Sequence, residues 1–340
     1  MSMELDVNSL VGAIDAYILK SDKDLEDQLS AEGFVEARTA VECVATIEDG
    51  ITEAVTNHVD HILDQLAGCD NIADFFERLW PDTCSEEELV KALYALVFAE
   101  FQNMMNNCTV AWIMSTDAEL AEAIEPILSN PAVGFIHGWS QQLANIMNLR
   151  TKDDIEKILL DAQKNALSID DVSEMIADSG IREYGYRSRR VALTEVLRVE
   201  EYSHQEARVQ NPSCYAKKWR HVLSVHPREN HMAMDGQQVF KREAFTLVGR
   251  DGATYHPQCP RDTCLPAGES INCHCITDDV VDKEILGMSL EERLSIRQKC
   301  IDEVNAEYAE FEIWFENEYG DDVEWTEYNR IYEEWRNGNA

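Results

Sequence analysis

One segment of this chain differs in composition from everything around it, and it limits the folds that the chain can adopt. Between Trp219 and Cys275 lie four of the ten cysteines and five of the nine histidines, together with a loop rich in proline and glycine. The residues before this segment, and most of those after it, carry apolar side chains at the three- and four-residue spacing of amphipathic helices. The sequence therefore predicts a mainly α protein with a small α+β domain in its C-terminal half.

Local signals predict where several helices begin and end. The pairs Ser85–Glu88, Thr116–Glu119 and Ser289–Glu292 have the spacing of capping boxes, which start helices. Asn130-Pro131 predicts a helix end, because proline disfavours the helical conformation in the residue before it. We expect three successive regions: a helical region 1–154, the α+β domain 155–280 and an acidic helical tail 281–340.

The domain should open with helices and continue with short strands. One long helix is predicted from about Arg187 to Gln210, with Glu195 and Arg198 placed to pair at i,i+3. The stretch 219–226 has the apolar spacing of a strand, and the alternation in 237–248 predicts a hairpin. A further extended segment should run from residue 269 to residue 281.

The charge of the chain is strongly acidic, with one exception. There are 65 acidic and 29 basic residues, a formal net charge of −36, yet the island Arg182–Arg250 has a net charge of +5. Within it, Lys217, Lys218 and Arg220 flank Trp219, a pattern that suits contacts with nucleic acid. The alternative is that these bases pair with acidic residues of the chain itself.

The N-terminal sequence and the uncharged stretches bear on location. The start MSMELDVNSL lacks a positive region followed by an apolar run, so we expect no secretion signal and synthesis in a reducing cytoplasm. The uncharged stretch 129–149 is interrupted by Pro, Gly, Gln and Asn, so no membrane segment is expected.

The cysteines and histidines of the central segment are candidate metal ligands. Zinc takes four such ligands, and a reducing compartment favours metal binding over disulfides. The candidates are Cys259, Cys264, Cys273, Cys275 and His231. Their spacing is not that of a zinc ribbon, so two alternatives stay open: a thiol cluster without metal, and a disulfide between Cys259 and Cys264 or between Cys273 and Cys275.

Catalysis finds little support in the sequence. Cys273 with His231 or His274 could form a Cys–His pair, but no pattern marks an oxyanion hole or an acid that would orient the histidine. The H-E-x-x-H motif of zinc proteases is absent. We therefore expect no enzyme and name no catalytic residue, with a zinc- or thiol-dependent enzyme as an alternative.

The acidic tail contains three tryptophans, Trp314, Trp325 and Trp335. Aromatic side chains on an acidic helix can dock onto another surface, either a partner's or the chain's own. Packing of the tail on its own domain is the simpler interpretation, and both stay open at this point.

The order and spacing of the motif residues resemble the Mu F-like head morphogenesis proteins of tailed phages, also called minor head or minor capsid proteins. The resemblance covers about residues 155 to 278. The matching residues are Arg189, Ala192, Thr194 and Glu195, then Trp219, then Arg228, His231, Asp235 and Gly236, then Phe245 and Pro257, and last Asn272, Cys273 and Cys275.

The sequence departs from the family pattern in three respects. His274 stands where the family usually has arginine, Ser224 stands where aspartate is common, and Cys259 and Cys264 are not family positions. A four-cysteine zinc site would therefore be peculiar to this chain.

The resemblance implies a virion component and a shared site. The site would consist of His231, Cys273 and Cys275, supported by Asn272 and Arg228. Such a protein is expected at the portal vertex in the head interior, and in the host cytoplasm during assembly. Its expected partners are the portal protein and, beyond it, scaffold or major capsid protein, with DNA contact as a further interaction.

Overall fold

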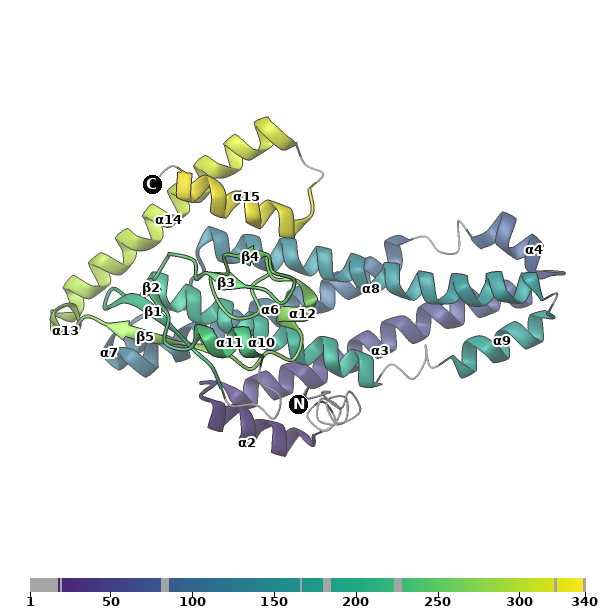
Figure 1. The fold of residues 1–340 in the computed structure, drawn as a ribbon, viewed down its shortest axis with the longest axis horizontal. Helices are drawn as coiled ribbons and strands as arrows, with labels where there is room; N and C mark the ends of the chain where they lie inside the picture. Colours follow the sequence, from purple (N-terminus) through teal and green to yellow (C-terminus); the bar gives the residue numbers. More distant parts are fainter. Residues whose placement is uncertain are drawn as a thin grey trace, which may run out of the picture. The chain divides into compact units, whose positions relative to one another are not determined.

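The computed structural model describes residues 18, 20–80, 86–165, 167–179, 185–222, 228–320 and 323–338. Within these ranges the chain is mainly helical with two small antiparallel sheets, which confirms the prediction of a mainly α chain with a small β part (Figure 1). The elements in order are α2 (Asp22–Glu32), α3 (Ala37–Ala67), α4 (Ile72–Asp74), η1 (Phe75–Leu79), α6 (Glu86–Thr116), α7 (Ala118–Ala123), α8 (Asn130–Lys164), α9 (Ile169–Asp178), α10 (Gly185–Gln210), β1 (Cys214–Arg220), α11 (Glu229–Met234), β2 (Gln238–Phe240), β3 (Leu247–Val248), β4 (Thr254–Tyr255), α12 (Ala267–Ser270), β5 (Ile276–Val281), α13 (Lys283–Leu286), α14 (Leu290–Tyr319) and α15 (Trp325–Gly338).

The chain forms two compact units, and each is discontinuous in sequence. Unit 1 combines Met1–Cys43, Phe101–Ile136 and Leu193–Ala340, and unit 2 combines Val44–Glu100 and His137–Ala192. The sequence had instead suggested three consecutive regions. The long helices account for the difference, because α3, α6, α8 and α10 each contribute one part to one unit and the rest to the other.

Unit 2 contains helices alone among its described residues. Its helices α3 and α6 approach closely at Gly50, where an added Cβ would lie 2.5 Å from Leu96 Cδ2. Arg189 on α10 pairs with Glu48 on α3 at 2.9 Å. Ser168 and its partner Asp171 form a capping box at the start of α9.

Helix α10 is the predicted long helix, and its apolar stripe is buried. Ala192, Val196, Val199, Ser203 and Ala207 are all at most 3% exposed. A buried stripe of this length needs neighbouring elements to cover it, and α10 contributes residues to both units.

The main sheet of unit 1 has the strand order β2-β1-β5, with both pairings antiparallel. β1 begins at Cys214, earlier than the predicted strand at 219–226, because the buried Lys217 hides the alternating pattern. The predicted 237–248 hairpin is wrong: β2 pairs with β1, and β3 pairs with β4. The last strand begins at Ile276 and not at residue 269, because the chain turns first at residues 271–272.

Two predicted helix boundaries are wrong for local reasons. Helix α7 is capped by Asp117, whose Oδ1 accepts from Leu120 N at 3.1 Å, and not by the Thr116–Glu119 pair. Asn130 begins α8 and does not end a helix. Pro131 then lies in the first turn, where a missing N–H leaves no hydrogen bond unmade.

Of the other two predicted capping boxes, the Ser289–Glu292 box of α14 is confirmed, with both of its reciprocal hydrogen bonds present. Ser85 lies outside the described residues.

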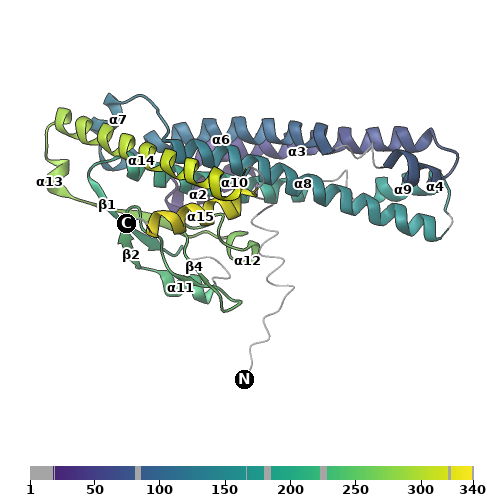
Figure 2. The ribbon, with the colours of Figure 1, turned by 90° about the horizontal axis from the view of Figure 1, so that it is seen from above.

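The tail folds back on itself as a pair of antiparallel helices, α14 and α15 (Figures 1 and 2). Aromatic residues from both helices share one core, whose buried members are Tyr308, Phe311, Phe315, Ile331 and Tyr332. Trp314 and Trp335 pack against this core, and Trp325 is only 8% exposed. The aromatic residues of the tail are thus used within the chain.

Candidate functional site

The structure brings together His231, Cys273 and Cys275. His231 Nδ1 lies 3.5 Å from Cys273 Sγ and 3.6 Å from Cys275 Sγ. The three side chains come from α11 and from the segment that leads into β5, and each residue is at most 3% exposed. Among the described residues, they are the group whose geometry could hold a metal ion.

Glu269 on α12 holds the far side of the histidine ring. Its Oε2 lies 3.0 Å from His231 Nε2 and accepts from Asn230 Nδ2 at 3.1 Å, while its Oε1 accepts from the Arg250 backbone N–H at 3.0 Å. Burial alone would raise the pKa of Glu269, but these donors and the imidazole bring that pKa down to about 2. An ionised carboxylate only accepts, so Nε2 of His231 donates to Glu269, and Nδ1 faces the two sulfurs.

Arg261 fixes the backbone that carries the two cysteines. Its guanidinium donates Nη1 to Cys273 O at 2.7 Å and to Cys275 O at 2.9 Å, and Nε to Leu197 O at 3.0 Å. Arg198 of α10 in turn donates to the Arg261 carbonyl. The Cys-x-Cys segment is therefore connected through two buried arginines to the long helix.

The residue before Cys273 is suited to the turn that precedes the cysteines. Asn272 has φ +55°, a left-handed conformation that asparagine tolerates better than most residues. Cys273 N donates to Ser270 O at 3.1 Å, which closes the turn. His274 points to the other side of the segment, where Nδ1 lies 3.2 Å from the carboxylate of Glu32.

An apolar shell closes the site. Trp219 is fully buried and meets the rings of His231 and Phe245 edge-on, with centroids 6.0 Å and 5.3 Å apart. Gly236 has φ +83°, and its N–H donates to Trp219 O at 2.9 Å, so the turn after α11 needs a residue that accepts this conformation. Arg228 donates Nε to Gly268 O at 3.1 Å and so connects the start of α11 to α12.

The cluster favours ionisation of one sulfur. The thiol of Cys275 donates to Cys273 and lowers the pKa of Cys273 well below its usual range, against the effect of burial, with His231 and Arg261 acting in the same direction. The same hydrogen bond and burial raise the pKa of Cys275. The arrangement can therefore place a thiolate and an imidazole nitrogen around the same point.

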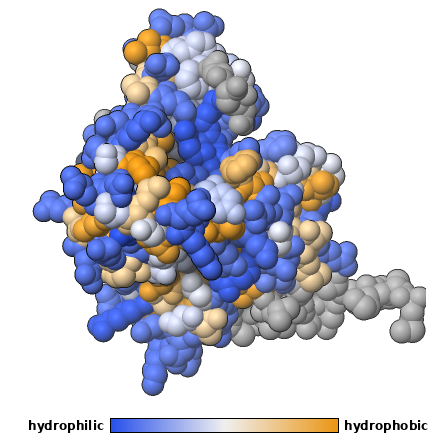
Figure 3. Space-filling model, turned by 90° about the vertical axis from the view of Figure 1, so that its left-hand side faces the viewer, coloured by the Kyte–Doolittle hydropathy of each residue, from blue (hydrophilic) through white to orange (hydrophobic). Residues whose placement is uncertain are grey.

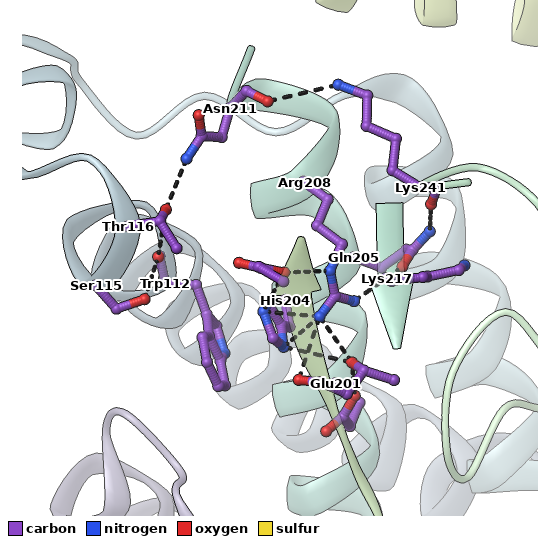
Figure 4. A network of polar contacts seen from close by, with 12 residues as sticks. Trp112, Ser115, Thr116, Glu201, His204, Gln205, Arg208, Asn211, Lys217 and Lys241 are labelled. Carbon is purple, nitrogen blue, oxygen red and sulfur yellow. Dashed lines mark hydrogen bonds and ion pairs between the residues drawn. The ribbon is translucent and has the colours of Figure 1, made fainter. Parts of the chain in front are cut away.

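A second buried network joins α10 to the sheet (Figure 4). Arg208 points from the helix toward the sheet, and its Nε donates to Asp279 Oδ1 on β5 at 2.6 Å. His204 stacks on Trp112 at a centroid distance of 3.4 Å, and burial together with the Arg208 charge lowers the pKa of His204 to about 4. Burial raises the pKa of the neighbouring Glu201 to about 7.

The remaining predicted metal ligands lie outside the cluster. Cys259 and Cys264 are free thiols that do not join the His231 group, so the predicted five-ligand set is wrong in these two members. Cys264 only packs against the apolar shell. The free state of all four sulfurs also leaves no disulfide between Cys259 and Cys264 or between Cys273 and Cys275.

The predicted nucleic-acid contacts separate into different environments. Lys217 is fully buried, and its Nζ donates to Gln258 O at 2.8 Å and to Gln258 Oε1 at 2.7 Å, so this side chain cannot reach a nucleic acid. Arg220 pairs with Asp278 at 3.0 Å. Lys218 is exposed. The prediction is thus wrong for Lys217, whose partners are neutral groups and not the acidic residues that the alternative foresaw.

The motif residues of α10 are not members of the His231–Cys273–Cys275 group. Glu195 pairs with Arg198 at 2.8 Å, as expected, and both side chains are buried. Thr194 is 6% exposed. Arg189 belongs to unit 2. Of these, Glu195 is connected to the site, because its partner Arg198 holds the Arg261 carbonyl.

Sequence reasoning missed two residues of the site, Glu269 and Arg261. Neither has a spacing signal, because Glu269 lies on α12, a helix of four residues that is too short for an apolar stripe, and Arg261 stands between two other candidates.

Fold and site together define a mainly helical protein in which a small sheet module holds a buried Cys–His–Cys cluster. The chain is 30% identical over 313 residues to the uncharacterized protein YqbB of Bacillus subtilis (strain 168), a match that covers 86% of this chain and 97% of YqbB. The chain therefore belongs to the same family as YqbB. No protein-family model matches the chain, and no solved structure matches it.

A second relative matches over a shorter stretch. The NAD(+)–arginine ADP-ribosyltransferase EFV of Enterococcus faecalis (strain ATCC 700802 / V583) is 29% identical over 129 residues, which is 37% of this chain and 24% of that protein. Most of that enzyme lies outside the match, so its named activity describes that protein alone.

Proposed function

We propose that this protein is a minor head protein of a tailed bacteriophage, which associates with the portal protein and acts in head assembly and genome delivery. The proposal rests on the resemblance of residues 155 to 278 to the Mu F-like head morphogenesis proteins. Scaffold or major capsid protein would be further partners, and the head interior at the portal vertex would be its location.

The observation that carries the proposal is the convergence of the motif residues. Trp219, His231, Gly236, Cys273 and Cys275 are separated by up to 56 positions in sequence, yet they form one compact sheet module. A motif whose scattered members meet in space is more specific than the same residues in sequence order. This supports a shared module, and hence the role that the resemblance implies.

The basic island offers little free positive charge to nucleic acid, which weakens the DNA-binding alternative. Seven of its arginines form ion pairs with acidic residues of the chain: Arg187, Arg189, Arg198, Arg208, Arg220, Arg242 and Arg250. Binding to nucleic acid depends on basic side chains that neutralise phosphates. A net charge of −36 instead suits a protein that must not be trapped on packaged DNA.

For the enzyme alternative, the structure supplies an acid that orients the histidine, but the thiol is not accessible to a substrate. Cys273, His231 and Glu269 are arranged in the order of a thiol, a base and an acid. A nucleophile must reach its substrate, and these three residues are at most 3% exposed. The geometry therefore favours a structural role for the cluster.

The surface leaves apolar side chains for protein contacts. The face in Figure 3 is mostly hydrophilic with separate apolar patches. On the edge strand β2, Phe240 is 63% exposed. Edge strands are common places for partner contact, since they present unpaired backbone groups. In the part of the chain that the structure describes, no helix is both long and apolar enough to cross a membrane.

The test is co-expression of the tagged full chain with the portal protein of the phage or prophage that encodes it. We expect the two to copurify, and quantitative mass spectrometry of purified heads to find this chain at a low copy number relative to the major capsid protein. Phe240→Asp should weaken copurification, whereas Ile313→Asp is a matched control at similar exposure. Absence of the chain from purified heads, together with no portal association, would refute the proposal.

A further inference from the structure

Three ligand atoms surround one point inside the sheet module. His231 Nδ1 lies 3.5 Å and 3.6 Å from the two sulfurs of Cys273 and Cys275, and all three atoms lie within 4.8 Å of one another. A tetrahedral zinc ion, with Zn–N of about 2.05 Å and Zn–S of about 2.3 Å, places nitrogen and sulfur ligands roughly 3.6 Å apart. The two nitrogen–sulfur separations match the edges of such a tetrahedron.

Hydrogen bonds alone explain the position of His231 Nδ1 between the two sulfurs less well than a bound metal ion does. Nδ1 of His231 can make one strong hydrogen bond, either as donor or as acceptor, yet two sulfurs approach it at nearly equal distances. Sulfur forms only weak hydrogen bonds in either role. A single cation at the centre would satisfy the nitrogen and both sulfurs at once.

We propose that His231, Cys273 and Cys275 bind one zinc ion, or a similarly thiophilic divalent cation, as a buried structural site. One imidazole and two sulfur ligands suit zinc, whereas magnesium and calcium require oxygen ligands. Two thiolates balance the charge of a divalent ion, so the ion and its two sulfur ligands together carry no net charge. His221 or a water molecule completes the tetrahedron.

His221 is placed near the site by the end of β1. Its backbone N–H donates to Asp235 Oδ1 at 2.9 Å, which anchors it beside the turn after α11. Its imidazole interacts electrostatically with both Cys273 and His231.

The surroundings of the ligands have the features that metal sites use to orient them. A metal-bound histidine usually donates its second nitrogen to a carboxylate, and Glu269 occupies that position at 3.0 Å from Nε2. Glu269 is itself held by Arg250 and Asn230, so the ring orientation is fixed from behind.

Both sulfurs of the Cys-x-Cys segment face the histidine. Residues i and i+2 of an extended segment point to the same side, and His274 between them points to Glu32. Arg261 holds the carbonyls of both cysteines, which fixes the spacing of the pair. Two ligands from one Cys-x-Cys segment lie close together. The hydrogen bonds from Arg261 hold the backbone of this segment in the geometry that brings both sulfurs to the histidine.

Metal content of the purified full chain tests the inference, and it does not depend on the proposed role in head assembly. We expect one zinc ion per chain by elemental analysis. Exchange for Co²⁺ should give the intense visible bands of a tetrahedral site and a thiolate charge-transfer band in the near ultraviolet. Cys273→Ser and Cys275→Ser should each weaken that band by about half, because each removes one of two thiolates.

Matched variants separate ligands from bystanders. Cys259→Ser and Cys264→Ser remove free thiols outside the cluster and should keep both the zinc and the cobalt spectrum. Glu269→Gln keeps all three ligands but weakens the orientation of His231, so the zinc affinity should fall roughly 10- to 100-fold. His221→Gln should change the cobalt spectrum if this residue is the fourth ligand and leave it unchanged if water is.

Two results would overturn the inference. One is a chain purified without metal that gives no thiolate charge-transfer band with Co²⁺. The other is a chain whose mass is lower by two hydrogens, with Cys273 and Cys275 joined as a disulfide. If a cysteine variant fails to fold, chelation of the wild-type chain still decides the question, since removal of a structural ion should lower its melting temperature.

Discussion

Replacing Arg261 by lysine tests how the cysteine segment is held. Arg261 is fully buried and donates to three main-chain carbonyls, those of Cys273, Cys275 and Leu197. Lysine keeps the positive charge but replaces the planar fork by a single ammonium group on a different stem. From one position the lysine ammonium group cannot reach all three carbonyls, so we expect two of them to lose their hydrogen-bond partner in the interior.

The expected cost follows from this count. A buried polar group left without a partner costs about 1–3 kcal/mol, so two such carbonyls cost about 3 kcal/mol in the free energy of unfolding. With a urea dependence of about 3 kcal/mol/M, the unfolding midpoint should move down by about 1 M. Circular dichroism and tryptophan fluorescence should be followed together, because coincident curves justify a two-state treatment.

Arg38→Lys is the matched control. Arg38 pairs with Glu42 on the exposed surface of α3, where lysine can make the same contact, so its unfolding curve should overlay that of the wild type. The Arg261→Lys variant should also expose Cys273 and Cys275 to thiol reagents. An Arg261→Lys midpoint equal to the wild-type value, with unchanged thiol reactivity, would show that the guanidinium does not hold the cysteine carbonyls.

Three further predictions concern the rest of the molecule. Burial raises the pKa of Glu201 to about 7 from the ordinary value of 4.5, so between these pH values the folded chain keeps a proton that the unfolded chain releases. The contribution of Glu201 to the free energy of unfolding is therefore fully present at low pH and is lost as the pH rises toward 7. The difference in unfolding free energy between wild type and Glu201→Gln should therefore fall by about 3 kcal/mol from pH 4.5 to 7, and a flat difference would contradict the assignment. Lys217→Glu should prevent folding, because it buries a carboxylate against the oxygens of Gln258, whereas Lys218→Glu should fold normally by circular dichroism; a folded Lys217→Glu chain would be the contrary result. Ser289→Ala removes the cap of α14 and should lower stability by about 1 kcal/mol in thermal unfolding, unless the helix start is held by tertiary contacts alone.

The sequence by itself determined the helical character of the chain and several helix boundaries. The apolar stripe of α10 and the capping box at Ser289 are local features, in which residues three or four positions apart decide the free energy of one segment. The motif order also predicted that His231 meets Cys273 and Cys275, and the structure places them within hydrogen-bonding distance. A proline disfavours the helical conformation in the residue before it, and it also suits the first turn of a helix. The local signal at Asn130-Pro131 therefore did not separate a helix end from the helix start that the structure shows.

Only the tertiary structure decided which strands pair, which cysteines stand apart and which charges are buried. Lys217 reads as a surface residue until β1 is placed between β2 and β5 with Gln258 above it. Glu269 and Arg261 have no periodicity, and their roles come from contacts with residues 38 and 12 positions away. Such contacts depend on the packing of the whole unit, because a buried polar group gains its partner only when distant segments have already come together.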